Sequence, residues 1–214
     1  MPIDKRRETK VIAVVVADVM GADPADRAHI RATLERVNVL FRPAIAEPFG
    51  LAGDDRVDGV LADPAQTPLC LSVLRELLAP RLLRAGVGVG VVDRLRDSTV
   101  SDRDAYTVAR RALQFVIRDK GLTRYLGTGD AGDVLLGALC RLVDPLILAR
   151  TAKQWEAIAA YRELGHQREV AERLGVTRQS VGDRLSAGNR RAVEEADAAI
   201  AAYLSYQRRQ RFGG

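Results

Sequence analysis

Cysteine, aromatic residues and long apolar runs are all scarce in this sequence of 214 residues. Its two cysteines, Cys70 and Cys140, are too few for a disulfide framework or a cysteine zinc site, and each is expected as a buried thiol. Aromatic residues make up 5% of the chain, so the core is expected to consist of Val, Leu, Ile and Ala. The longest apolar run, residues 134–148, is interrupted by Arg141 and Asp144 and predicts a core helix rather than a membrane span.

We do not expect a secretory signal at the start of the sequence, because the apolar stretch at residues 11–16 is too short and ends at Asp18. Together with the isolated cysteines, this predicts a cytoplasmic protein that has no membrane partner. The formal net charge is +5, which favours a polyanionic partner. Basic clusters lie near both ends of the chain: Lys5, Arg6, Arg7 and Lys10, and then Arg208, Arg209 and Arg211. These clusters suit phosphate contacts and solubilising termini about equally.

Residues 167–189, QREVAERLGVTRQSVGDRLSAGN, have the pattern of a helix-turn-helix. Apolar residues recur at helical spacing in both expected helices: Val170, Ala171, Leu174, Val181 and Leu185. Between the helices, Gly175 supplies the left-handed turn residue, and Thr177 stands at the N-cap position of the second helix. An ordinary helical hairpin and a protein-binding helical domain are the alternatives.

The second helix of this motif carries outward-facing side chains that can hydrogen-bond base edges in the major groove. The expected DNA-binding residues are Arg168, Arg173, Thr177, Arg178, Gln179, Ser180 and Arg184. We expect Arg178, Gln179 and Arg184 to contact bases. We expect Arg168, Arg173 and the basic tail to contact phosphates. One such module makes few contacts, so specific binding predicts a homodimer that reads two half-sites on double-stranded DNA.

Strand and helix signals alternate over the first 118 residues. Strands are expected at 11–16, 44–52, 57–61 and 87–92, and helices at 24–40, 69–83 and 102–117. This order is that of a ferredoxin-like or palm domain (split βαβ), with its helices on one face of the sheet. The segment GVGVG at residues 86–90 lies inside a strand and predicts close approach of a helix to the sheet rather than a phosphate loop.

The remainder of the chain is expected to be helical beyond a glycine-rich connection at residues 119–133. The predicted class is α+β, with a ferredoxin-like/palm domain over residues 1–120, a helical linker over 121–150 and an all-α helix-turn-helix domain over 151–214. The last helix, 190–209, has an apolar stripe that predicts packing against the protein's own core, with pairing in a dimer as the alternative.

Three carboxylates carry the chemical interest of the first half: Asp18 at the end of the first strand, and Asp54 and Asp55 at the tip of a hairpin. In a split-βαβ sheet these elements are neighbours, so the three acids are expected to converge. Converging aspartates at strand ends can hold Mg²⁺, which takes hard oxygen ligands and substrate phosphates. A Gly-Asp-Asp hairpin turn with no ligand is the alternative.

Five segments together resemble the SatD family of bacterial proteins: VIAVVVADVMGA, FGLAGDDRVDGVLADP, RAGVGVGVVD, SDRDAYTVARRAL and the helix-turn-helix. The resemblance implies a palm-like domain, akin to class III nucleotidyl cyclases and GGDEF domains, before a helix-turn-helix similar to sigma-factor region 4. It also implies a DNA-binding or regulatory role. The family's acids fall on Asp18 and on the Gly53-Asp54-Asp55 hairpin. The chain departs from the family at Asp55-Arg56-Val57, where the family has Glu-Phe-Gln, and at Gly59, which comes one place late.

These observations predict a DNA-binding transcriptional regulator of the SatD type with a palm-like sensor or dimerisation domain, gated by a nucleotide or a divalent ion. The alternative is a Mg²⁺-dependent nucleotidyl cyclase or nucleotidyltransferase that uses Asp18, Asp54 and Asp55, with its helix-turn-helix as a tether to DNA or to a partner.

Overall fold

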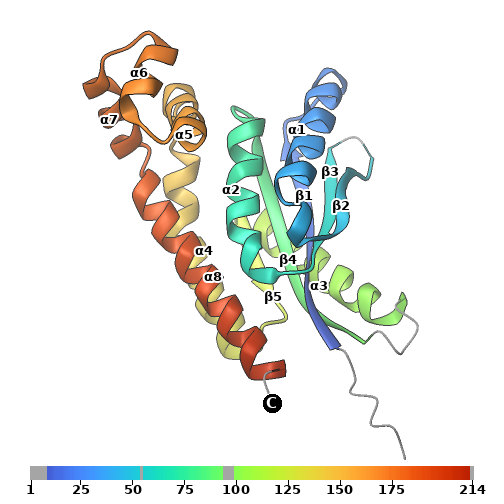
Figure 1. Cartoon of the computed structure of the whole chain (residues 1–214). Coiled ribbons are helices and arrows are strands. Elements are labelled where there is room, and N and C mark those ends of the chain that lie inside the picture. The colour runs from blue at the N-terminus through green and yellow to red at the C-terminus, as the bar shows by residue number, and fades with distance from the viewer. Residues whose placement is uncertain (1–8, 54, 94–98, 213–214) are drawn as a thin grey trace, which may run out of the picture.

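The computed structural model describes residues 9–53, 55–93 and 99–212, and it has the predicted α+β class (Figure 1). The strands are β1 (Thr9–Met20), β2 (Ile45–Leu51), β3 (Arg56–Leu61), β4 (Leu82–Asp93) and β5 (Thr123–Leu126). The α-helices are α1 (Arg27–Leu40), α2 (Thr67–Leu78), α3 (Thr99–Arg118), α4 (Asp130–Leu148), α5 (Ala152–Leu164), α6 (Gln167–Leu174), α7 (Arg178–Ala187) and α8 (Arg190–Phe212). Short 3-10 helices are η1 (Pro24–Asp26), η2 (Arg42–Ala44) and η3 (Pro64–Gln66).

The strands form one sheet in the order β2-β3-β1-β4-β5. All neighbouring pairs are antiparallel except β4 and β5, which are parallel. The chain order β1-α1-β2-β3-α2-β4 with this strand order is a split-βαβ arrangement. The fifth strand lies inside the segment that was expected to be only a connection. Four residues between glycine-rich turns are too short to show a strand period, which explains why the sequence pattern missed it.

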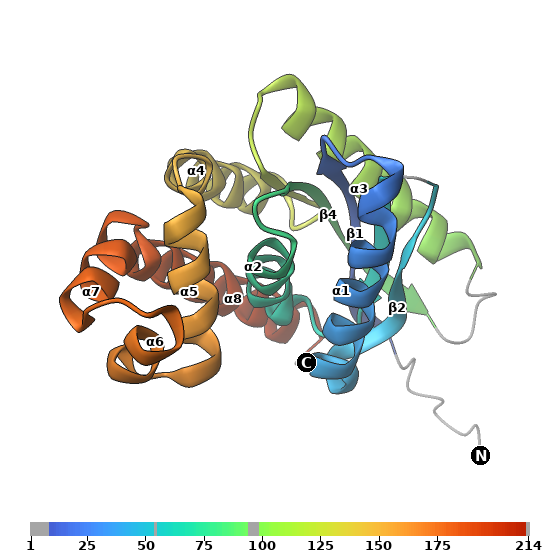
Figure 2. The same ribbon diagram turned by 90° about the horizontal axis from the view of Figure 1, so that it is seen from above.

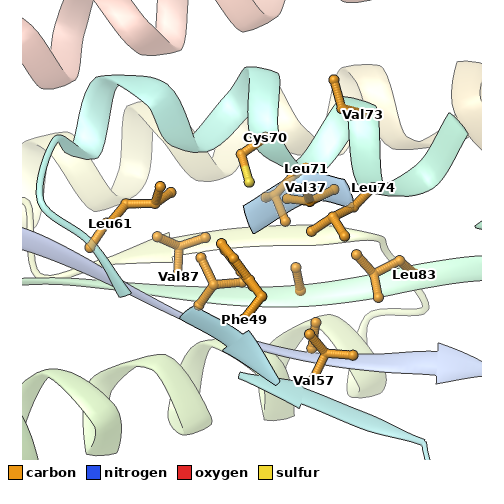
Figure 3. Close-up of a cluster of buried hydrophobic side chains, with 14 of the residues drawn as sticks. Val37, Phe49, Val57, Leu61, Cys70, Leu71, Val73, Leu74, Leu83 and Val87 are labelled. Carbon is orange, nitrogen blue, oxygen red and sulfur yellow. The ribbon is translucent and has the colours of Figure 1, made fainter. Parts of the chain in front are cut away.

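Strand β1 is buried on both faces, as its continuous β-branched run predicts. On one face Val15 packs in a core shared with α1 and α2, while on the other Val14 packs against Ala109 of α3. The expectation that all helices cover one face is therefore wrong, because α3 covers the opposite face. Figure 3 shows α2 above the strands and α3 below them.

The glycines of β4 allow α3 to lie close to the sheet, as predicted. A Cβ atom on Gly86 would lie 2.2 Å from the carbonyl oxygen of Ala109, and one on Gly88 would lie 2.3 Å from that of Ala105. Real Cβ atoms do not approach backbone that closely, so a larger residue at either position would push α3 off the sheet.

The larger core lies between the sheet, α1 and α2 and consists mostly of aliphatic side chains (Figure 3). From α2, Cys70, Leu71 and Leu74 are essentially fully buried over Leu61 and Leu83 from the strands. The two cysteines of the chain are free and buried, as expected from their apolar surroundings.

Helix α8 packs against the protein's own core, as predicted. Its apolar stripe buries Val193, Ile200 and Leu204 against α2, α4 and neighbouring elements. From above, α2 lies between α1 on one side and α5 and α8 on the other (Figure 2). Among the described residues, no helix is both long enough and apolar enough to span a membrane.

Candidate functional site

Helices α5, α6 and α7 form a small three-helix unit at one end of the molecule (Figure 1). Its core consists of Ala157, Ile158, Ala160, Val170, Ala171, Val181 and Leu185. Four of the five apolar positions predicted to face inward are buried, and Leu174 is partly buried against the same core. These side chains hold α6 and α7 firmly on α5, so the orientation of α7 is set by packing.

The turn between α6 and α7 has the predicted construction. Gly175 adopts the left-handed conformation (φ 62°, ψ 35°), and the amide of Val176 donates to the carbonyl of Ala171 at 3.0 Å. Thr177 is the N-cap of α7, where its hydroxyl oxygen accepts a hydrogen bond from the amide of Ser180 at 3.1 Å. The Thr177 hydroxyl oxygen therefore caps α7, while its O–H group is still able to donate.

The first residues of α7 after the cap are open to solvent. Arg178 and Gln179 are both exposed, and within the described residues neither side chain has an ion pair or a hydrogen bond. Side chains at the start of a rigidly held helix can reach a ligand that meets the helix end-on or along its exposed face. Guanidinium and carboxamide groups offer paired donors, or a donor and an acceptor, to such a ligand.

The other predicted arginines are engaged with carboxylates. Arg168 pairs with Glu172 (Nε–Oε1 3.1 Å), and Arg173 pairs with Glu163 (Nη1–Oε2 2.5 Å). Both pairs lie at the surface, where solvent keeps such pairs weak and exchangeable.

Arg184 differs from these two surface arginines. Its side chain is only 18% exposed and points to Glu156 of α5 (Nη1–Oε2 3.5 Å). It lies a turn and a half beyond the free pair Arg178 and Gln179. The structure thus brings Arg178 and Gln179 together at one accessible end of α7, and it places Arg184 against α5.

The C-terminal basic cluster does not extend this surface. Lys5, Arg6 and Arg7 lie outside the described residues. Arg208 lies near the far end of the 23-residue α8 and pairs with Asp63 (Nη1–Oδ1 3.2 Å). At about 1.5 Å per residue this is some 30 Å from the start of α8 next to α7. The expectation that the tail shares a phosphate surface with α6 and α7 is therefore wrong, because α8 carries it to the opposite end of the molecule (Figure 1).

Two of the three predicted acids are neighbours. Asp18 lies in β1, two residues before its end at Met20 and next to the β2–β3 hairpin, and the amide of Val19 donates to the carbonyl of Asp55 at 2.9 Å. Burial raises the pKa of the Asp18 carboxyl, and Asp55 raises it further, while the guanidinium groups of Arg56 and Arg84 oppose the rise. Asp54 lies outside the described residues.

Within the part of the chain that the structure describes, Asp18 already has cationic neighbours. Arg56 and Arg84 are its cross-strand neighbours on the two adjacent strands, and Arg56 Nε lies 3.6 Å from Asp18 Oδ1. Two guanidinium groups thus flank the carboxylate and supply the positive charge that a dication would bring. Over residues 9–53, 55–93 and 99–212, no three His, Cys, Asp or Glu side chains gather as a metal site requires.

Sequence reasoning missed a polar bridge between distant parts of the chain. Glu163 at the end of α5 accepts from Arg36 of α1 (Nη2–Oε1 2.5 Å) as well as from Arg173 of α6. Hydrogen bonds from Arg173 and Arg36 lower the pKa of Glu163, so the carboxylate stays charged. Arg36 and Glu163 are 127 residues apart, and no local pattern signals such a pair.

Comparison with known proteins adds two distant likenesses. No protein-family model matches the chain, and no curated protein has a similar sequence at a significant level. Among solved structures, the regulator of polyketide synthase expression from Bifidobacterium adolescentis is 12% identical, over 95% of this chain and 82% of that one, with a TM-score of 0.26. The guanylyl cyclase Cya2 is 11% identical, over 49% of this chain and 72% of that one, with a TM-score of 0.26. Scores this low carry no argument about function.

Proposed function

We propose that this protein is a DNA-binding transcriptional regulator in which α6, the turn and α7 act as a helix-turn-helix. The proposal rests on Arg178 and Gln179. Both side chains are exposed and, within the described residues, form no ion pair or hydrogen bond, and they lie at the start of a capped helix that packs on α5. A helix of this kind fits the major groove, with its N-terminal residues at the base edges. In this arrangement α6 crosses the phosphate backbone.

The two side chains suit different bases. A guanidinium donates two hydrogen bonds to the O6 and N7 atoms of guanine, and a carboxamide pairs with the N6 and N7 atoms of adenine. We assign Arg178 and Gln179 these roles. Arg168 and Arg173 on α6 turn to phosphate by exchanging their surface carboxylates for phosphate oxygens, at little cost because exposed pairs are weak. Ser180 and Arg184 lie deeper and support the helix more than they contact DNA.

We propose further that the sheet and its helices form a palm-like domain of the SatD type that serves as a sensor or dimerisation module. Helix α4 supports a homodimer, because it leaves large apolar side chains in solvent. These are Val134, Leu135, Leu142 and Leu148, with exposed fractions of 66, 47, 72 and 39%. At 100° per residue they fall on one side of the helix, so a second copy of the same face would cover them around a two-fold axis.

The alternative of a Mg²⁺-dependent nucleotidyl cyclase or nucleotidyltransferase has less support. Arg56 and Arg84 give Asp18 cationic neighbours within the protein, and no observation on the described residues favours nucleotide turnover. Hydrolysis or cyclisation of a nucleoside triphosphate that needs Mg²⁺ or Mn²⁺ and is abolished by Asp18→Ala would favour the enzyme over the regulator.

Selection of genomic fragments by the purified protein at near-physiological salt tests the proposal. We expect an enriched sequence motif that is lost in the double variant Arg178→Ala, Gln179→Ala. A control variant, Arg31→Gln, changes an exposed residue on α1, outside α6 and α7, and should enrich the same motif as the unaltered protein. Recovery of the same motif by the double variant, or binding without any motif, contradicts base reading by α7.

A further inference from the structure

A cleft of about 730 Å³ lies between α1 and α2 on one side and α5 on the other. This volume is in the range of small-molecule sites. Its walls are mostly apolar, with Leu40 and Phe41 from α1 and the residue after it, and Leu69, Val73 and Leu77 from α2. Leu40 and Leu69 are 57 and 43% exposed, so the cleft is open to solvent along its apolar wall.

Three groups of charged side chains border the cleft, and they differ in net charge. One is Asp63, which pairs with Arg208 (Oδ1–Nη1 3.2 Å) and is neutral together with it. At its floor, Glu76 and Arg162 form a two-point ion pair that is neutral overall, and Glu76 is buried. At its rim, the single carboxylate of Glu163 is shared by Arg36 and Arg173, so this group carries one excess positive charge. Arg36 is 53% exposed and lines the cleft, which leaves part of its guanidinium fork available.

We propose that this cleft binds a small amphipathic molecule with one carboxylate and an unbranched apolar body. The carboxylate pairs with the guanidinium of Arg36, where the excess charge lies, and the chain lies along Leu40, Leu69 and Leu77. Arginine matches a carboxylate through two parallel hydrogen bonds, which makes this end of the cleft selective for the anion. The Glu76–Arg162 pair is neutral overall and engages Nε and Nη2 of Arg162, so it attracts an anion less than the Arg36 group does.

We also infer that this site regulates DNA binding, an inference that rests on the proposed function. Glu163 joins α1 to α6 because it holds Arg36 and Arg173 at once. A ligand carboxylate on Arg36 competes with Glu163 and weakens the link between the sheet domain and the first helix of the DNA-binding unit. Ligand binding is thereby coupled to the DNA affinity of α6 and α7.

Isothermal titration calorimetry of the full chain with octanoate, 1-octanol and octylammonium tests the ligand site. We expect octanoate to bind at least roughly tenfold more tightly than the other two probes. Arg36→Gln should remove this preference, and Leu40→Asp should weaken octanoate binding by about tenfold or more, because it places a negative charge in the apolar wall. The matched controls are Arg31→Gln and Val39→Asp, exposed neighbours on α1 that do not line the cleft, and both should leave binding unchanged.

Equal binding of the three probes, octanoate binding that is insensitive to Arg36→Gln, or no octanoate binding overturns the site. These titrations contain no DNA, so their failure leaves the proposed DNA binding intact, and failure of DNA binding leaves the ligand site intact. With a bound duplex, octanoate should shift the DNA affinity of the unaltered protein by about fivefold or more and that of Arg36→Gln by less. An unchanged affinity in the presence of bound octanoate overturns the coupling.

Discussion

Arg162 of α5 holds Glu76 of α2 in a two-point ion pair, with Arg162 Nη2 2.7 Å from Glu76 Oε1, although the two residues are 86 positions apart in the chain. Glu76 is almost fully buried, while the Arg162 side chain keeps 29% of its surface exposed. The pair fixes α5 against the sheet domain. Because α6 and α7 pack on α5, it also sets how the proposed reading helix is presented.

Loss of this arginine should be costly. Arg162→Ala leaves the Glu76 carboxylate buried without a partner, so we expect the free energy of unfolding at pH 7 to fall by about 3 kcal/mol. Burial already raises the pKa of Glu76, and Arg162 opposes the rise, so the deficit should shrink as the pH falls and Glu76 takes up a proton. Urea denaturation at two pH values measures both effects. Arg168→Ala, which breaks an exposed pair, is the control and should change stability by less than about 0.5 kcal/mol.

Loss of the N-cap of α7 should lower the free energy of unfolding by less than loss of Arg162 does. Thr177→Ala removes the acceptor for the amide of Ser180 and should lower the free energy of unfolding by about 1 kcal/mol. Thr177→Ser retains the hydroxyl oxygen and should recover most of the loss in the same denaturation experiment. A serine variant as unstable as the alanine variant would show that the methyl group of Thr177, rather than the cap, matters.

Stability should depend on pH through Asp197 in α8. Burial raises its pKa to about 6, against the opposing hydrogen bond from Ser72 and the nearby charges of Arg75 and Arg162. A carboxyl whose pKa is higher in the folded state binds more protons there than in the unfolded chain. Its contribution to stability therefore falls as the pH rises from about 4 to about 6.

The variant Asp197→Asn isolates this effect, because the amide keeps an oxygen for the Ser72 hydroxyl and cannot ionise. Between pH 4 and pH 7 we expect the unaltered protein to lose roughly 2 kcal/mol more stability than the variant. Parallel pH profiles of the two proteins, measured by chemical denaturation, would contradict the raised pKa.

The exposed face of α4 predicts the oligomeric state. Leu142→Asp puts a charge in the middle of this face, where the side chain is 72% exposed, so the monomer should fold normally but fail to associate. Sedimentation velocity should give a dimer for the unaltered protein and a monomer for the variant. Val39→Asp on α1 makes the same change at a similarly exposed position outside this face and should remain dimeric.

Sequence patterns predicted the local features well. The apolar spacing of Val170, Val181 and Leu185, the turn glycine Gly175 and the cap Thr177 all act within a few residues of one another, and each has the predicted conformation. The glycines of β4 also predicted a helix close to the sheet, and α3 does lie so close that Cβ atoms at these positions would clash with it. Short-range sterics and periodicity suffice for such predictions.

The failures concern relationships between distant residues. Nothing near Asp18 in the chain indicates that Arg56 and Arg84 are its cross-strand neighbours, which give the carboxylate cationic partners. The bridge from Arg36 to Glu163 and the far position of Arg208 also depend on tertiary packing. Residue type shows that these side chains are charged, but only the fold shows which charge each one meets.

Fluorescence anisotropy with an enriched duplex and a scrambled duplex at near-physiological salt tests whether Arg178 and Gln179 read bases. The unaltered protein should prefer the enriched duplex, and Arg178→Ala should lose about 1–3 kcal/mol of that preference at a single base position. The double variant Arg178→Ala, Gln179→Ala should bind both duplexes alike, with an affinity close to that of the unaltered protein for the scrambled duplex. A double variant that keeps the full preference, or an unaltered protein without any preference, contradicts the account.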